Sequence, residues 1–272
     1  MGYLTTEKKK VTVKTFVEMK RDGNKIAMLT AYDYTTARLI DEAGVDSILV
    51  GDSASNVMLG NDSTLPITLD EMIVYARGVA RGCQRALVVC DMPFGSYQVS
   101  PEEGVRNAVR LIRETGVDAV KLEGGEEVAP TIERIVNAGI PVVGHLGLTP
   151  QSIHKFGGYG VRARSEMEAT KLIADAQALE NAGCFAVVLE KIPASVAQQV
   201  TDLLSVPTIG IGAGSHCDGQ VLVYADAMGL TQGFEPKFLR EFAAMGEELR
   251  RGVRAYCEAV KGDEFPNESE SY

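Results

Sequence analysis

Three acidic side chains follow short apolar runs in this sequence. Asp52 follows SILVG, Asp91 follows ALVVC and Glu123 follows AVKL. Short apolar runs predict strands buried on both faces, and parallel sheets hold their ligands at the carboxyl ends of such strands. Oxygen ligands with no nearby histidine or cysteine pair suit a hard cation, Mg²⁺ above all. The pattern therefore predicts a magnesium site, with helix capping by each carboxylate as the alternative.

Lys121 lies two positions before Glu123. Residues two apart on a strand face the same side, so both side chains point into the same space. A lysine among apolar neighbours is costly unless it is paired. We therefore predict that Lys121 pairs with a carboxylate or with a bound substrate anion. A Schiff-base lysine is a less favoured alternative, because the neighbouring acids hold the amine protonated.

Glu190 and His145 end two further apolar runs, AVVL and PVVG. Because the metal hypothesis uses the other three acids, Glu190 is left as the candidate general base. Its alternatives are an ion pair with Lys191 or a helix cap. His145 is a candidate for hydrogen bonding a substrate oxygen, with a purely structural histidine as the alternative.

Eight strand-like runs alternate with helical patterns, and no linker divides the 272 residues. The strand-like runs are 26–30, 46–50, 86–90, 118–122, 141–144, 185–189, 208–211 and 227–230. This alternation predicts a single (β/α)₈ TIM barrel over residues 1–272 with an N-terminal cap helix at 15–22. A doubly wound open sheet is the alternative. We expect residues 1–13 to form a loose arm and residues 262–272 to form a disordered tail.

Composition narrows the classes of partner and location. The net charge is −10 and no basic stripe is present, which argues against nucleic acid or an anionic membrane as a partner. No run approaches the roughly 18 apolar residues of a transmembrane helix. The five cysteines form no CxxC pair and are odd in number, which predicts reduced thiols in a cytoplasmic protein.

A set of long, ordered motifs resembles the ketopantoate hydroxymethyltransferase family over roughly residues 14–260. The motifs are LTAYDYTTARL, ILVGDS, GNDSTLPITLDEM, VVCDMPFGSY, VKLEGGEE, PVVGHLGLTPQS, FGGYGV, VVLEKIP, IGIGAG, CDGQVLV and PKF. The resemblance implies a (β/α)₈ barrel related to the phosphoenolpyruvate mutase and isocitrate lyase group. It also implies hydroxymethyl transfer from 5,10-methylenetetrahydrofolate to 3-methyl-2-oxobutanoate, giving 2-dehydropantoate and tetrahydrofolate on the route to pantothenate.

The resemblance also implies roles for individual residues. Asp52 and Asp91 are expected to bind Mg²⁺, with Glu123 in the metal shell. Glu190 matches the proton acceptor that forms an enolate stabilised by Mg²⁺. The residues expected to hold the keto acid are Asp52, Ser53, Asp91 and Lys121.

The resemblance further implies a homo-oligomer, often a decamer. One stretch departs from the family, because residues 232–238 read QGFEPKF where close relatives read GGHIPKF. Any role of a histidine there is absent from this chain. The long connections 52–69 and 146–164 are expected to act as lids or walls for the folate co-substrate.

Two other functions remain as alternatives. Another Mg²⁺-dependent lyase or mutase of the same barrel group would act on a 2-oxo acid. Those enzymes generally carry a catalytic cysteine in a KKCGH-like loop, which this chain lacks. A non-enzymatic ligand-binding barrel is the second alternative, and the combined set of acids with Lys121 disfavours it.

Overall fold

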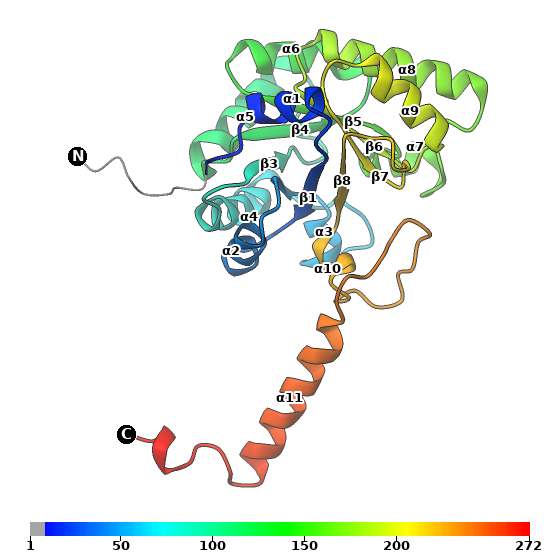
Figure 1. Cartoon of the computed structure of the whole chain (residues 1–272). Coiled ribbons are helices and arrows are strands. Elements are labelled where there is room, and N and C mark those ends of the chain that lie inside the picture. Colours follow the sequence, from blue (N-terminus) through cyan, green and yellow to red (C-terminus); the bar gives the residue numbers. More distant parts are fainter. Residues whose placement is uncertain (1–8) are drawn as a thin grey trace. The chain divides into compact units, whose positions relative to one another are not determined.

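Eight parallel strands close into a barrel in the order β1 to β8 (Figure 1). The structure is a computed structural model and describes residues 9–272. The strands are β1 Ile26–Thr30, β2 Ser47–Val50, β3 Leu87–Asp91, β4 Ala119–Glu123, β5 Val142–Gly147, β6 Ala186–Glu190, β7 Thr208–Ile211 and β8 Gly219–Leu222. The predicted (β/α)₈ barrel is therefore confirmed.

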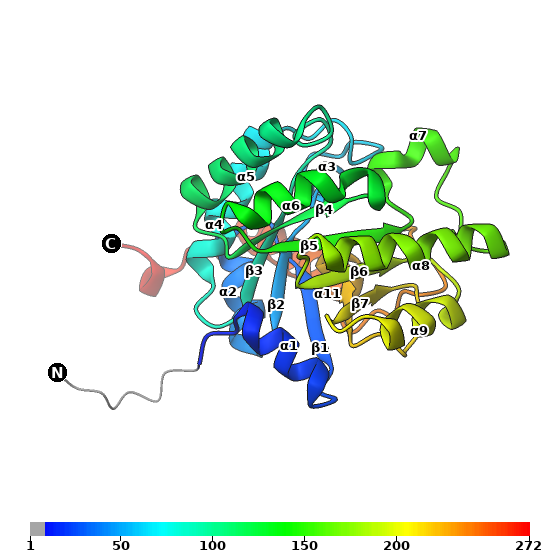
Figure 2. The same cartoon turned by 90° about the horizontal axis from the view of Figure 1, so that it is seen from above.

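Helices surround the strands of the barrel (Figure 2). They are α2 Tyr34–Ala43, α3 Ala54–Val57, α4 Leu69–Gly82, α5 Pro101–Thr115, α6 Ala129–Asn137, α7 Ile153–Phe156, α8 Glu166–Asn181 and α9 Ala194–Leu203, with the short 3₁₀ helices η1 Glu126–Val128 and η2 Pro150–Ser152. Helix α5 illustrates how local sequence determines where a helix begins and ends. The Ser100 side chain accepts a hydrogen bond from the Glu103 N–H at its start, and Gly116 ends it in a left-handed conformation.

The predicted cap helix is α1, Val13–Arg21, which begins with a capping box between Thr12 and Thr15. Phe16 is fully buried and meets the Phe185 ring edge-on, with 5.8 Å between the ring centroids. Phe185 precedes β6, so α1 closes the end of the barrel at which the strands begin. The carboxyl ends of the strands open at the other end.

The predicted position of the eighth strand was wrong. Residues 227–230 are not a strand, and Ala227 instead ends helix α10, Tyr224–Ala227. Strand β8 lies earlier, at Gly219–Leu222, where it pairs with both β1 and β7. Its exposed Gln220 and its short length weaken the apolar pattern from which a buried strand is predicted.

The chain divides into a barrel unit that ends at Val223 and a C-terminal unit, Tyr224–Tyr272. The C-terminal unit contains α10, α11 Met245–Lys261 and the 3₁₀ helix η3 Glu268–Glu270. A single domain over 1–272 and a disordered tail at 262–272 stay predictions.

The predicted loose arm at 1–13 is described only from residue 9 onward, and residues 1–8 lie outside the described residues. Within the described part, Lys10 pairs with Asp118 at 2.8 Å and Val11 is buried. Across residues 9–272 we find no helix with the length and apolar character needed to span a bilayer.

Candidate active site

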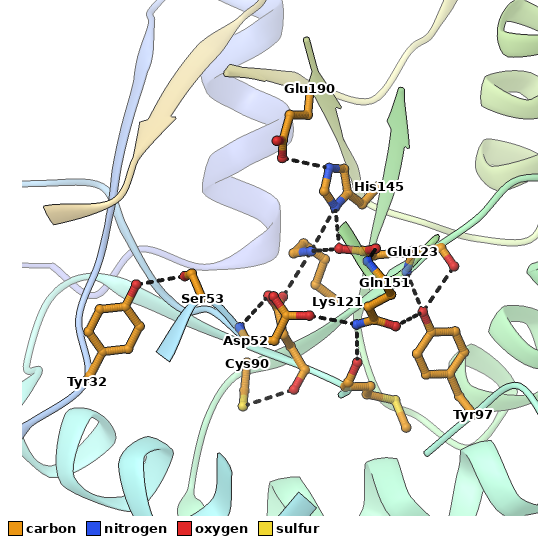
Figure 3. Close-up of polar contacts among 12 residues, drawn as sticks. Tyr32, Asp52, Ser53, Cys90, Tyr97, Lys121, Glu123, His145, Gln151 and Glu190 are labelled. Carbon is orange, nitrogen blue, oxygen red and sulfur yellow. Dashed lines mark hydrogen bonds and ion pairs between the residues drawn. The ribbon is translucent and has the colours of Figure 1, made fainter. Parts of the chain in front are cut away.

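The carboxyl ends of β2, β3 and β4 bring the predicted acids together around Lys121 (Figure 3). Asp91 and Lys121 are register partners across β3 and β4, and Lys121 Nζ lies 3.1 Å from Asp91 Oδ1. The same nitrogen lies 3.9 Å from Glu123 Oε1. Asp52 follows β2, and its backbone N–H donates to Asp91 Oδ2 at 3.0 Å. All four side chains are buried. Lys121 therefore has the carboxylate partners that its position predicts.

Burial and mutual repulsion dominate the electrostatics of this cluster. Burial raises the pKa of Asp52 well above its ordinary value, and the charges of Asp91 and Glu123 raise it further. Burial also raises the pKa of Asp91, against the opposing effect of Lys121. Burial alone would lower the pKa of Lys121, but Asp91, Glu123 and Asp52 together raise it. The lysine therefore stays charged, and the charged forms of Asp52 and Asp91 are disfavoured when no further cation is nearby.

His145, in β5, lies between two carboxylates from neighbouring strands. Its Nδ1 is 3.2 Å from Glu123 Oε1, and its Nε2 is 3.4 Å from Glu190 Oε2. Burial lowers the pKa of His145 and Lys121 opposes its charge, but Glu123 and Glu190 raise the pKa to about 9. An Nδ1–H that donates to Glu123 has no lone pair for Lys121, 3.1 Å away, so Asp91 is the partner of the lysine.

Gln151 is a functional residue that reasoning from the sequence missed. Its Nε2 donates to Asp52 Oδ2 at 2.9 Å and to the Met92 carbonyl at 3.0 Å. Its Oε1 accepts from the Tyr97 hydroxyl at 2.7 Å, and its backbone N–H donates to Glu123 Oε2 at 2.9 Å. One buried residue therefore orients two of the three predicted metal ligands. A lone glutamine in a PQS motif gives no signal of this role.

Ser53 lies beside the cluster but outside its network of charges. Its hydroxyl is 2.7 Å from the hydroxyl of Tyr32, which follows β1. Gly51 is needed for this approach, because a Cβ there would lie 2.6 Å from Ser53 Oγ. The turn thus places the Ser53 hydroxyl and the Asp52 carboxylate at the same strand end.

The chemistry of the site fits a hard cation, because Asp52, Asp91 and Glu123 supply carboxylate oxygens at the same end of the barrel. Across residues 9–272, no three His, Cys, Asp or Glu side chains converge on one metal position. Both oxygens of Glu123 are engaged, one by His145 and one by Gln151. Both oxygens of Asp91 have partners as well, Oδ1 in Lys121 and Oδ2 in the Asp52 N–H. Asp52 accepts from Gln151 on Oδ2. Mg²⁺ commonly binds one or two carboxylates and completes its shell with water and substrate oxygens.

The fold has relatives among solved structures. A putative phosphonomutase from Burkholderia cenocepacia J2315 superposes with a TM-score of 0.62 at 14% identity, over 92% of this chain and 98% of that one. 2,3-Dimethylmalate lyase gives a TM-score of 0.58 at 18% identity, over 94% of this chain and 89% of that one, and is described as a PEP mutase/isocitrate lyase superfamily member. These likenesses show a shared fold, a closed barrel of eight parallel strands with surrounding helices.

Sequence similarity identifies the family. The family model described as ketopantoate hydroxymethyltransferase matches residues 10–268. The 3-methyl-2-oxobutanoate hydroxymethyltransferase of Parabacteroides distasonis is 60% identical over 98% of this chain and 97% of its own length. That of Flavobacterium johnsoniae is 59% identical over 97% of each chain. This chain belongs to the ketopantoate hydroxymethyltransferase family, which confirms the predicted family and the prediction of an enzyme.

Proposed function

We propose that this enzyme transfers a hydroxymethyl group from 5,10-methylenetetrahydrofolate to 3-methyl-2-oxobutanoate, giving 2-dehydropantoate and tetrahydrofolate on the route to pantothenate. The names of its relatives support the keto acid as the acceptor. The observation that carries the proposal is the position of Glu190. It ends β6, apart from the carboxylates proposed to hold the metal, and His145 lies between it and Glu123.

The keto acid is proposed to bind where Lys121 meets the carboxylates of Asp52 and Asp91. Asp52 and Asp91 are the residues that would hold Mg²⁺, with Glu123 in its surroundings. When bound, Mg²⁺ withdraws electron density from the ketone of the keto acid and so makes the proton on C3 more acidic. Lys121 balances the negative charge of the substrate carboxylate. The Ser53 hydroxyl and the Nε2–H of His145, which makes no hydrogen bond to the described residues, offer hydrogen bonds to the substrate oxygens.

Glu190 is proposed to remove the C3 proton. Its side chain is 17% exposed, whereas those of Lys121, Asp91, Glu123 and His145 are 3–4% exposed. The base therefore lies at the open edge of the site, where a second substrate approaches. His145 Nε2 lies 3.4 Å from its carboxylate, an ion-pair contact without a hydrogen bond. The resulting enolate carbon bonds to the methylene carbon of the donor, and both bonds from that carbon to the folate nitrogens break. A water supplies the hydroxyl group. Its remaining proton and the proton taken from C3 go to the two nitrogens, so that tetrahydrofolate leaves.

Replacing Glu190 by glutamine tests this assignment. Glu190→Gln keeps the size of the side chain and removes the base. We expect exchange of the C3 proton of 3-methyl-2-oxobutanoate in deuterated water, with Mg²⁺ and without folate, to slow by a factor of roughly 100 or more. Calorimetric binding of Mg²⁺ and keto acid should stay near the wild-type values, because neither requires this carboxylate.

Glu166→Gln is the matched control, because Glu166 is an exposed glutamate at the start of α8. It should exchange at the wild-type rate. Wild-type exchange in Glu190→Gln would mean that another group, with His145 as the next candidate, is the base. Exchange in the wild type without any folate-dependent product would indicate a different enzyme acting on 2-oxo acids.

We also propose a homo-oligomer, a decamer by resemblance to the family, in the cytoplasm. The location rests on the thiols. All five cysteines are free, and Cys90, Cys184 and Cys217 are buried. Reduced, unpaired cysteines are typical of a reducing compartment.

A further inference from the structure

The backbone next to the proposed base is strained. Lys191 directly follows Glu190 and has a φ of +45°, in the left-handed region that residues with a side chain rarely adopt. Of the residues 9–272, only two other non-glycine residues have positive φ, and one of them is Ala163, at +53°. Strain of this kind persists where the surrounding structure enforces it, and it concentrates at functional sites.

Hydrogen bonds join Lys191, directly after the end of strand β6, to the loop 157–162, which Ala163 follows directly. The Arg162 N–H donates to the Lys191 carbonyl at 2.9 Å. The side chain of Lys191 reaches the carbonyl of Tyr159, which accepts a hydrogen bond from Nζ at 2.5 Å. The Lys191 N–H donates to Ile211 in β7 at 2.9 Å. Lys191 thus fastens the loop to the barrel at two points.

The fastened loop borders the open side of the site. The Tyr159 hydroxyl lies in the field of Asp52 and Glu190, which add to the effect of burial in raising its pKa. The Tyr159 side chain is nevertheless 47% exposed. Arg162 and Phe156 also line a pocket that reaches the strand end at Gly147. An exposed aromatic ring beside a pocket is typical of a surface that binds a planar ligand.

The residues at the end of β5 pack directly against the backbone of Glu190. The Leu148 N–H donates to the Glu190 carbonyl at 2.8 Å. Gly147 has a φ of +92°, and a Cβ there would lie 2.2 Å from the same carbonyl oxygen. The backbone of Glu190 is therefore fixed from β5, independently of the Lys191 side chain. Removing that side chain should release the loop and leave the base in place.

We infer that Lys191 is a positioning residue that holds the loop 157–162 as the wall against which the one-carbon donor, a reduced folate with a planar ring system, binds. The inference rests on the proposed function and adds to it the location of the second substrate. It separates the two substrates in space. The keto acid uses the buried carboxylates and Lys121, whereas the donor uses the loop that Lys191 fastens.

Lys191→Met tests the inference, because methionine has a similar length and lacks the ammonium. We expect the KM for 5,10-methylenetetrahydrofolate to rise about tenfold, the order expected when a charge-assisted hydrogen bond is lost. Folate-free exchange of the C3 proton should stay within about twofold of the wild type. Trypsin should cleave after Arg162 or Arg164 several-fold faster, because the loop is released. Lys191→Arg should restore both properties.

Two further variants complete the test. Lys191→Gly removes the left-handed strain, so it should fold at least as well as the wild type and still show the higher KM and faster cleavage. Lys14→Met removes an exposed cation of α1, at the opposite end of the barrel, and should change neither. An unchanged donor KM with unchanged cleavage in Lys191→Met would overturn the inference, as would an equal loss of exchange and transfer. Absent exchange in the wild type would instead contradict the proposed function.

Discussion

At the scale of single residues, Gln151 shows how an uncharged side chain controls a charged site. Its amide uses both donors and its acceptor oxygen at once, on Asp52, Met92 and Tyr97. A buried carboxylate without a partner is costly. The hydrogen bond to Asp52 Oδ2 therefore stabilises this carboxylate in one orientation, with its other oxygen free for a cation. Residues that orient metal ligands in this way tune metal affinity.

We predict that Gln151→Met weakens Mg²⁺ binding by a factor of about 10–100, the usual effect of losing a partner that orients a ligand. Methionine fills a similar volume but makes neither amide hydrogen bond. Calorimetric titration with Mg²⁺ measures the affinity. Gln198→Met, an exposed change on α9, is the control and should bind as the wild type does. Equal affinities in both variants would mean that Gln151 only fills space.

Charged residues at strand ends could be predicted from the sequence, but their hydrogen-bond partners could not. Asp52, Asp91, Glu123, Lys121, His145 and Glu190 all lie at one end of the barrel, as their positions after apolar runs indicated. Gln151 and Tyr97 join this group only through the folding of loops. Whether three or two carboxylates bind the metal depends on side-chain orientation. The partners of Asp52, Asp91 and Glu123 fix that orientation, and no spacing in the sequence reveals them.

At the scale of elements, the two ends of the barrel have different roles. The strand ends carry the acids, and Asp91, Glu123 and Glu190 are the last residues of β3, β4 and β6. The opposite end is closed by α1, whose Phe16 packs among the first residues of the strands. Stability and chemistry are thereby placed at different ends.

We predict that Phe16→Ala lowers the free energy of unfolding by about 3–5 kcal/mol, the usual cost of removing a buried aromatic side chain. Val17→Ala, on the exposed side of the same helix, should change it by less than about 0.5 kcal/mol. Denaturant titration gives both values. Activity of Phe16→Ala below its unfolding transition should match the wild type, since the cap lies away from the site. Unchanged stability would show that α1 is not part of the cooperative barrel.

The elements that were predicted well are those with a strong period and clear caps. Ser100, Pro101 and Gly116 marked both ends of α5. Strand β8 was misplaced because it has only four residues and includes the exposed Gln220, so pairing with β1 and β7 defines it more than its own pattern does. Short elements depend on tertiary contacts, which a local pattern does not contain.

At the scale of the whole molecule, the stability of the barrel depends on acidic side chains that are buried close together. Asp52 has an ordinary pKa of 3.8, which burial, Asp91 and Glu123 raise. Above pH 3.8 the unfolded chain releases this proton more readily than the folded chain does. Stability without metal therefore falls as the pH rises from 3.8 toward the higher folded pKa, and the loss persists at higher pH. A bound cation reverses this effect, because it favours the charged carboxylate.

We therefore predict opposite effects of Asp52→Asn with and without metal. The asparagine oxygen still accepts the Gln151 hydrogen bond, so the metal-free variant should unfold at a higher temperature than the wild type at pH 7. Each kcal/mol corresponds to about 2–4 °C for a protein of this size. Mg²⁺ at about 100 times its Kd should stabilise the wild type by about 2.7 kcal/mol and the variant by much less.

Thermal unfolding with a chelator and then with Mg²⁺ measures both effects on the same samples. Asp62→Asn, in the loop after α3, is the control, because Asp62 is exposed and lies outside the buried cluster. It should follow the wild type in both conditions. A metal-free Asp52→Asn that is less stable than the wild type would show that this carboxylate supports the fold. A full response of that variant to Mg²⁺ would remove Asp52 from the metal site, leaving Asp91 and Glu123 as the carboxylates to test.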